Sequence, residues 1–312
     1  MKRFDYHVPQ SIEEALNLFK SLGDAIYIAG GTDVMVNIKR KKISPKNLIS
    51  LRNITALKVI EKGKELKIGS CVTHEQLLKD KYIEKYYTAL HDAVRKLGSK
   101  QIRNVATIGG NICNAAPSAD TACPLLVFDT KVLIRNEKGE RKIPLHDFFL
   151  GPYSVSKDEG EIVTGFEITF LPPYSGSAYI KHSRREAMDL AIVSVATRLT
   201  LSPEVDIDFL KREAGEKTYS EFESRLLSYG ITVKEARIAM GVVAPRPLRA
   251  KEAEDYLCGK RLTDEAIREA SEIASSVAKP RDTLRGEAWY RREMVKVLTR
   301  RAILLSAKRA FD

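Results

Sequence analysis

Two glycine pairs, far apart in the chain, place the strongest constraint on how this sequence folds. The first lies in "IAGGTD" at residues 28–33 and the second in "TIGGN" at residues 107–111, and each follows a strand-like run. Glycine lacks a Cβ atom and reaches positive φ angles, so each pair predicts a tight turn that another group approaches closely. Neither turn contains G-x-G-x-x-G or G-K-[ST], so neither a Rossmann dinucleotide site nor a P-loop is predicted.

The residues beside these glycines favour a ligand that carries phosphate. Backbone N–H groups of two facing loops would hold a diphosphate from both sides, and Thr32 and Asn111 would add side-chain donors. Asp33 and Asp120 suit the hydroxyl groups of a sugar or ribitol chain better than phosphate. The small residues at 114–118 would leave a flat ledge for a planar ring.

Each of these features also has a simpler interpretation. Either glycine motif alone is a common turn. Asp120 precedes an apolar segment and would equally cap the helix predicted there, and Cys113 would equally be a small core residue. Spacing alone therefore indicates a phosphate-bearing cofactor without establishing it.

Composition excludes several functional classes. The chain has 312 residues, long enough for two domains, and a net charge of +11. Its basic residues lack interleaved aromatic residues, so nucleic acid is not expected, whereas an anionic ligand or an acidic partner is. Four cysteines without a C-x-x-C pair and five histidines predict free thiols and no metal site. There is no signal peptide and no apolar run of about 18 residues, so we expect a cytoplasmic protein that does not span a membrane.

Local patterns predict several element boundaries. Ser11, with Glu14 three residues later, predicts the N-cap of a helix that ends at Gly23. Thr263 predicts another N-cap, and residues 138–139 predict a turn between two strands.

Two later segments carry less specific signals. Residues 202–230 are charged and weakly periodic, and predict an insertion with a surface helix. The tail predicts a basic helix that packs either on its own domain or on a partner. Its apolar positions are Met294, Val297, Leu298, Ala302 and Leu305.

In order and length, these motifs resemble the FAD-binding (medium) subunits of the molybdenum hydroxylase family, which includes xanthine dehydrogenases and aerobic carbon monoxide dehydrogenases. The segments that carry the resemblance are "AGGTD", "IRNVATIGGNICNAAPSAD", "GEIVTGFEI", "KHSRREAMDLAIVSVA" and "ARIAMGVVAPRPLRAKEAEDYLCGK". It implies an α+β fold, with a two-lobed FAD-binding domain of the vanillyl-alcohol-oxidase-like (PCMH) type. A C-terminal α/β domain of the carbon monoxide dehydrogenase flavoprotein type would follow. The expected parts are lobe 1 at 1–57, lobe 2 at 58–173, the C-terminal domain at 178–285 and the basic helix at 286–312.

The resemblance also implies which residues bind FAD, with no catalytic residue and no metal ligand in this chain. They are Ala29, Gly30, Gly31, Thr32, Asp33, Thr107, Ile108, Gly109, Gly110, Asn111, Ala116, Asp120, Ile162 and Lys181. Val163 is an alternative to Ile162, and Lys181 is otherwise a solvated lysine. Some relatives place a tyrosine near the flavin where this chain has Leu190. The flavin subunit of 4-hydroxybenzoyl-CoA reductase carries an additional iron–sulfur cluster in a cysteine-rich insertion that this sequence lacks.

The implied function is electron transfer within a heterotrimer. A molybdenum subunit with molybdopterin would hydroxylate the substrate, and an iron–sulfur subunit with [2Fe–2S] clusters would pass electrons to FAD in this chain. FAD would then reduce an acceptor such as NAD⁺. Two alternatives are a stand-alone FAD oxidase or reductase, often with a covalent flavin link, and an interaction subunit without cofactor. The sequence does not indicate the substrate of the complex, the final acceptor or the stoichiometry.

Overall fold

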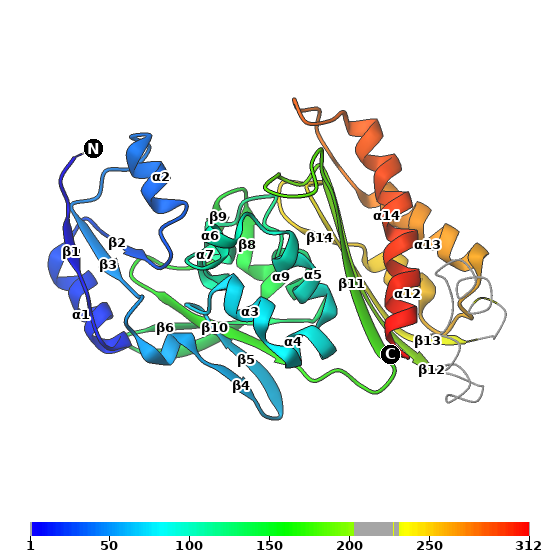
Figure 1. The fold of residues 1–312 in the computed structure, drawn as a ribbon, viewed down its shortest axis with the longest axis horizontal. Helices are drawn as coiled ribbons and strands as arrows, with labels where there is room; N and C mark the ends of the chain where they lie inside the picture. The colour runs from blue at the N-terminus through cyan, green and yellow to red at the C-terminus, as the bar shows by residue number, and fades with distance from the viewer. Residues whose placement is uncertain (1, 203–226, 228–230, 312) are drawn as a thin grey trace. The chain divides into compact units, whose positions relative to one another are not determined.

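The computed structural model describes residues 2–202, 227 and 231–311, and the chain divides into two compact units (Figure 1). Unit 1 comprises Met1–Lys79, Leu97–Ala116 and Asp129–Phe170, and unit 2 comprises Asp80–Lys96, Pro117–Phe128 and Leu171–Asp312. The chain therefore alternates between the units before it completes unit 2. The division into 1–57, 58–173, 178–285 and 286–312 stays a prediction.

The first part of unit 1 is a three-stranded parallel sheet with the order β1-β3-β2. Its elements are β1 (Asp5–His7), α1 (Ile12–Leu22), β2 (Ala25–Ile28), α2 (Val34–Lys39) and β3 (Asn47–Ser50). The predicted boundaries of α1 are confirmed, because Ser11 Oγ accepts a hydrogen bond from Glu14 N at 3.0 Å and Gly23 ends the helix with φ +56°. Helix α1 buries Ala15 and Leu16 against the sheet, so the first glycine pair emerges from a fixed strand end.

The second part of unit 1 is an antiparallel sheet with the order β4-β5-β10-β6-β7. The strands are β4 (Ile60–Lys62), β5 (Glu65–Gly69), β6 (Lys131–Asn136), β7 (Gly139–Pro144) and β10 (Ile162–Thr169), and the predicted turn at residues 138–139 joins β6 to β7. Its other elements are η1 (Thr55–Lys58), α3 (His74–Lys79), α6 (Lys100–Arg103), α7 (Ile108–Asn114), α9 (Leu145–Phe148) and the hairpin of β8 (Phe149–Gly151) and β9 (Ser154–Val155). The second glycine pair lies in the first turn of α7, whose N-cap is Thr107.

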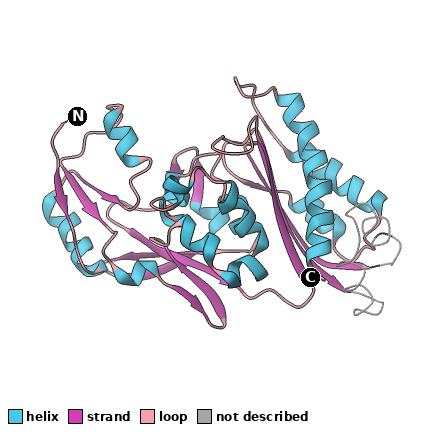
Figure 2. Ribbon diagram, in the orientation of Figure 1, coloured by secondary structure: helices cyan, strands magenta, loops and turns pink. Residues whose placement is uncertain are grey.

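Unit 2 is built on an antiparallel sheet with the order β11-β12-β13-β14 (Figure 2). The strands are β11 (Ser175–His182), β12 (Val193–Ser202), β13 (Thr232–Gly241) and β14 (Leu248–Arg249). The helices are α4 (Lys81–Tyr86), α5 (Thr88–Lys96), α8 (Ala122–Val127), α12 (Lys251–Leu257), α13 (Asp264–Val277) and α14 (Ala288–Arg309). Gly176 of β11 lies against α14 and Ser177 bonds to α5, so these helices cover opposite faces of the strand. Thr263 caps α13 as predicted, with its Oγ1 3.1 Å from Ala266 N.

The predicted apolar positions of α14 are only partly correct. Leu298 and Ala302 are buried, but Val297 is 40% exposed. The buried face instead includes polar residues: Ser306 Oγ lies 2.6 Å from Thr197 Oγ1 of β12. The helix therefore packs on its own unit, and polar contacts as well as apolar ones hold it there.

Two further expectations concern the chain as a whole. The insertion with a surface helix, predicted at 202–230, falls almost entirely outside the described residues. Within the described part of the chain, no helix combines the length and the apolar character needed to cross a bilayer.

Candidate functional site

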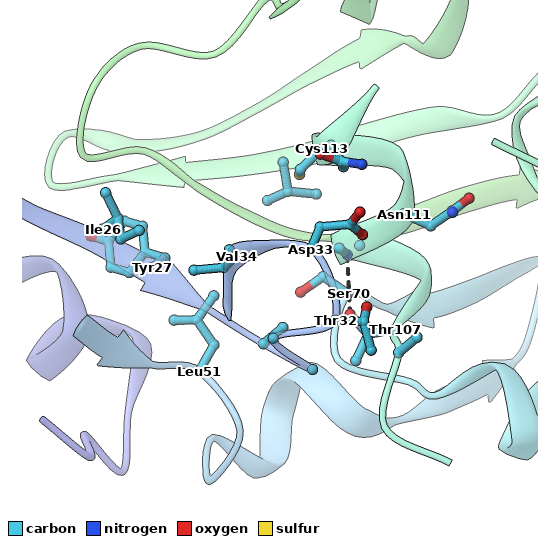
Figure 3. Close-up of a pocket in the computed structure, with 18 of the residues that line it drawn as sticks. Ile26, Tyr27, Thr32, Asp33, Val34, Leu51, Ser70, Thr107, Asn111 and Cys113 are labelled. Atoms are coloured by element: carbon cyan, nitrogen blue, oxygen red, sulfur yellow. Dashed lines mark hydrogen bonds between the residues drawn. The ribbon is translucent and has the colours of Figure 1, made fainter. Parts of the chain in front are cut away.

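A cavity of about 670 Å³ lies inside unit 1, where the two glycine motifs meet. Its volume falls in the range of small-molecule sites, about 300–1,000 Å³. Figure 3 shows Thr32 and Asp33 of the first loop beside Thr107 and Asn111 of the second, with Tyr27 at the other end. The two motifs are 74 residues or more apart in the sequence, yet both line the same cavity within a single unit.

A short segment after β5 brings the second motif into place. Gly109 N donates to Ser70 O at 2.9 Å, Ile108 N to Val72 O at 3.0 Å, and His74 N to Ala106 O at 3.0 Å. The first loop then packs directly on the residues before the second motif. A Cβ atom on Gly30 would lie 2.0 Å from Val105 O, so backbone meets backbone at this point.

The four glycines do not serve the same purpose. Gly30 and Gly109 are required by the protein's own packing, because a Cβ on Gly109 would lie 2.6 Å from Ser70. Gly31 adopts φ +73°, which favours glycine. Gly110 has a different environment, since an added Cβ would meet only Thr107 Oγ1, at 3.1 Å, and would otherwise point into open space. Of the four glycines, Gly110 is therefore the one whose lack of a side chain leaves room for a ligand.

The two loops differ in the hydrogen bonds that they can offer. Within the described residues, the backbone N–H groups of residues 29–33 have no acceptor, and these residues all line the cavity. In the second loop, every N–H from Ile108 to Asn111 already donates to the protein; Gly110 N, for example, donates to Thr107 Oγ1 at 3.0 Å. The N–H groups of residues 108–111 are therefore not free, because Thr107 and residues 70–72 accept from them.

Two buried polar side chains beside the second loop also lack partners. Ser70 Oγ and both ring nitrogens of His74 make no hydrogen bond in the described part of the chain. Burial, with a smaller contribution from the Arg103 guanidinium, lowers the pKa of His74 to about 3, so its ring is neutral. Buried polar groups normally have partners, so this region fits a ligand that carries polar atoms.

Aromatic and aliphatic side chains gather at the other end of the cavity. The rings of Phe19 and Tyr27 stack with their centroids 5.0 Å apart, and Tyr27 Oη donates to Gly160 O at 3.0 Å. Leu51 and Ile162 complete this end. An apolar surface beside a row of free N–H groups matches a planar ring joined to a diphosphate.

Most of the residues implicated from the sequence line this cavity. They are Ala29, Gly30, Gly31, Thr32, Asp33, Thr107, Gly109, Gly110, Asn111 and Ile162, together with the alternative Val163. Ile108 is fully buried in the core instead, and Ala116 follows the end of α7 without lining the cavity. Burial raises the pKa of Asp33, whose carboxyl group faces the cavity.

Asp120 and Lys181 belong to unit 2, where they form a buried pair. Lys181 Nζ lies 2.9 Å from Asp120 Oδ2, and Tyr179 Oη donates to Asp120 Oδ1 at 2.7 Å. Asp120 does not cap α8, whose N-cap position is Thr121. Lys181 is not solvated either, since its side chain is only 4% exposed. Leu190 is 48% exposed.

Sequence reasoning missed other residues that line the cavity, among them Ser70, His74 and Lys157. None stands next to a glycine pair. Ser70 and His74 reach the site through the pairing of residues 70–74 with 106–109, and Lys157 follows the β8–β9 hairpin. The pairing of residues 70–74 with 106–109, and the bond from Tyr153 N to Ala115 O near Lys157, are long-range contacts that no local pattern could have identified.

Comparison with known proteins adds independent information. Residues 2–170 match the family described as "FAD binding domain in molybdopterin dehydrogenase", and residues 178–306 match "CO dehydrogenase flavoprotein C-terminal domain". The chain is 31% identical to a xanthine dehydrogenase FAD-binding subunit of Escherichia coli O157:H7, over 96% of this chain and 94% of the relative. It is 30% identical to a glyceraldehyde dehydrogenase medium chain of Sulfolobus acidocaldarius, over 96% of each. The structure superimposes on a carbon monoxide dehydrogenase chain from Hydrogenophaga pseudoflava with a TM-score of 0.86 and 29% identity, covering 99% of this chain and 98% of the other.

Proposed function

This chain belongs to the family of FAD-binding medium subunits of molybdenum hydroxylases, and on that premise we propose that it carries electrons from an iron–sulfur partner to an external acceptor. FAD is its cofactor, and when bound it supplies one- and two-electron redox chemistry. The molybdenum and iron–sulfur centres belong to partner subunits. The observation that carries the proposal is the cavity of unit 1, with its row of free backbone N–H groups at residues 29–33.

The residues of this chain have distinct roles in the proposal. The N–H groups of residues 29–33 donate to the diphosphate, because they have no other acceptor in the described part of the chain. Thr107, Gly109, Gly110 and Asn111 form the wall that the diphosphate lies against. Asp33 accepts from a hydroxyl group, since a carboxylate beside phosphate would be repelled. Phe19, Tyr27, Leu51 and Ile162 exclude water from one ring of the ligand.

Asp120 and Lys181 contribute through unit 2. Burial raises the pKa of Asp120, while the Lys181 ammonium and the Tyr179 hydroxyl favour its ionised form. A carboxylate held by these two donors keeps lone pairs that can accept from a ribitol hydroxyl. We therefore retain both residues as cofactor-binding residues in the proposal, as the family resemblance implies.

Cofactor binding is tested on the purified chain. A visible spectrum recorded after incubation with FAD and removal of the excess should show flavin bands, and acid precipitation should release all of the FAD into the supernatant. Absence of flavin bands would refute cofactor binding by this chain. FAD that stays with the precipitate would indicate a covalent link, and so a stand-alone oxidase.

The direction of electron flow needs a separate experiment. Under anaerobic conditions, NADH is added to the FAD-loaded chain and flavin absorbance is followed in a stopped-flow instrument. Bleaching shows that this chain exchanges electrons with a nicotinamide, as an NAD⁺ acceptor requires. Without bleaching, NAD⁺ is not the acceptor at this subunit. Reduction of the flavin by substrate only when the iron–sulfur partner is present would support the path from that partner.

A further inference from the structure

The residues that line the unit 1 cavity carry more negative than positive charge, although the ligand proposed for it is an anion. Three carboxyl groups line the cavity, those of Asp33, Glu159 and Glu161, and a diphosphate would bring two more negative charges. Glu161 is already paired, with Arg141 Nη2 2.6 Å from its Oε2. Among the described lining residues, Lys157 is the single lysine or arginine. A buried anion without a counter-charge costs free energy. Lys157 is therefore the candidate counter-charge for an anionic ligand in this cavity.

Lys157 is held in a defined position. Its Nζ donates to Asp158 O at 3.0 Å and to Glu161 O at 2.9 Å, both of which are neutral backbone acceptors. A lysine ammonium has three N–H donors, so one remains available. No ion pair joins this lysine to a carboxylate within the described residues. Burial lowers the pKa of Lys157 by more than the nearby carboxylates of Asp158, Glu159 and Glu161 raise it.

The lysine lies between the end of α7 and the segment around Glu161, whose carbonyl oxygen accepts from its Nζ. Tyr153 N, at the start of the segment that leads to Lys157, donates to Ala115 O at the end of α7 at 2.9 Å. Lys157 also acts electrostatically on the thiol of Cys113, which lines the cavity one helical turn after Gly110. On this wall, the N–H groups of residues 108–111 already donate to the protein. The ammonium group of Lys157 would supply a hydrogen-bond donor and a positive charge on this wall.

We propose that Lys157 binds the diphosphate of FAD as its counter-charge, facing the N–H groups of residues 29–33 across the ligand. This inference rests on the proposed function of the cavity and adds a binding residue to it. The diphosphate is then held unequally: by neutral backbone donors from the first loop, and by a tethered ammonium from the wall of the second. Nothing in the proposal requires the lysine to take part in electron transfer.

The test compares three variants in unit 1: Lys157→Met, Lys157→Arg and Lys64→Met. Lys64 is exposed, so Lys64→Met removes the same charge without changing the cavity. Dissociation constants for FAD are measured by flavin fluorescence, and those for adenosine, AMP and ADP by displacement of FAD. We expect Lys157→Met to weaken FAD binding by about 10- to 100-fold, the range for a lost hydrogen bond to a charged group. Lys157→Arg should keep most of the affinity and Lys64→Met all of it.

Comparing adenosine, AMP and ADP distinguishes a lysine that contacts phosphate from one that only holds the loop in shape. If Lys157 contacts phosphate, the ratio of variant to wild-type dissociation constants should rise from AMP to ADP and stay near one for adenosine. An equal loss for all ligands would overturn the inference, because it would mean that Lys157 only shapes the loop through Asp158 and Glu161. Unchanged FAD binding in Lys157→Met would also overturn it. If the wild-type chain binds no FAD, the proposed function fails, which is a different result.

Discussion

A side chain added at Gly110 should abolish FAD binding and leave the protein folded. An added Cβ at this position would meet only Thr107 Oγ1, at 3.1 Å, so Gly110→Val places its extra atoms inside the cavity and not against backbone. In a helix, valine is favoured over glycine by a few tenths of a kcal/mol, so the free energy of unfolding of the apoprotein should change by less than about 1 kcal/mol. The diphosphate, in contrast, would have to move away from the wall of α7.

A diphosphate displaced from the α7 wall would lose its alignment with the N–H groups of residues 29–33, and the loss of affinity follows from those hydrogen bonds. Each hydrogen bond from a neutral donor to a charged oxygen contributes about 1.5–3 kcal/mol, so losing two costs about 3–6 kcal/mol. That corresponds to at least about 100-fold weaker binding. Gly110→Ala, with a single methyl group, should give a smaller loss in the same direction.

The assay combines a fluorescence titration with FAD and a urea unfolding curve for each apoprotein. Gly109→Ala is the matched control, because its Cβ would lie 2.6 Å from Ser70 and should lower the free energy of unfolding by about 1–3 kcal/mol. The reasoning would be refuted if Gly110→Val bound FAD within about threefold of the wild type. It would equally fail if Gly110→Val unfolded as readily as Gly109→Ala.

Two predictions concern stability. The pKa of His74 is lowered to about 3 in the folded protein. The neutral ring therefore stabilises the folded state fully above its ordinary pKa of about 6.5. This stabilisation is lost as the pH falls towards 3, and the free energy of unfolding decreases by up to about 1.4 kcal/mol per pH unit. Urea unfolding at pH 7, 5.5 and 4.5 should therefore show a smaller loss of stability on acidification for His74→Phe than for the wild type; equal losses would contradict this explanation. Arg309 Nη1 lies 2.6 Å from Asp92 Oδ2, so Arg309→Met should lower the free energy of unfolding by about 3 kcal/mol by leaving a buried carboxylate, and Asp92→Leu in the same chain should recover part of it. A melting temperature unchanged by Arg309→Met would show that the pair does not stabilise unit 2.

Sequence patterns predicted the local features of the fold well. Ser11, Gly23 and Thr263 stand at helix ends as expected, because each acts on backbone groups within a few residues. The fold class was also predictable, since the motifs are long and keep their order along the chain. Features of this kind depend on neighbours in the sequence, which a pattern can describe.

The helix α14 shows where pattern reasoning fails. Its buried face contains Thr299 and Ser306, which a search for apolar periodicity ignores. Ser306 instead bonds to Thr197 of β12, which lies 109 positions away in the sequence. Val297 was consequently assigned to a buried stripe although it is 40% exposed.

Most of the residues named from the sequence line one cavity, but the reason given for the glycines was incomplete. The glycines were interpreted as places where a ligand approaches, yet Gly30 and Gly109 accommodate Val105 and Ser70 of the protein itself. Which glycine faces the ligand depends on what packs behind it, and only the folded chain shows that. The same limit applies to Lys157, whose position depends on a hairpin that follows the second motif by about 40 residues.

The ion pair between Asp92 and Arg309 has a consequence for how the chain is made. These residues are 217 positions apart, and α5, which carries Asp92, belongs to a unit that also needs β11 and α14. At about 5–20 residues per second, a ribosome would take about 10–40 s to deliver Arg309 after Asp92. All segments of unit 1 have been synthesised by Phe170, well before that. During synthesis, the part of α5 that packs on β11 and bonds to α14 therefore stays uncovered until those elements have been made.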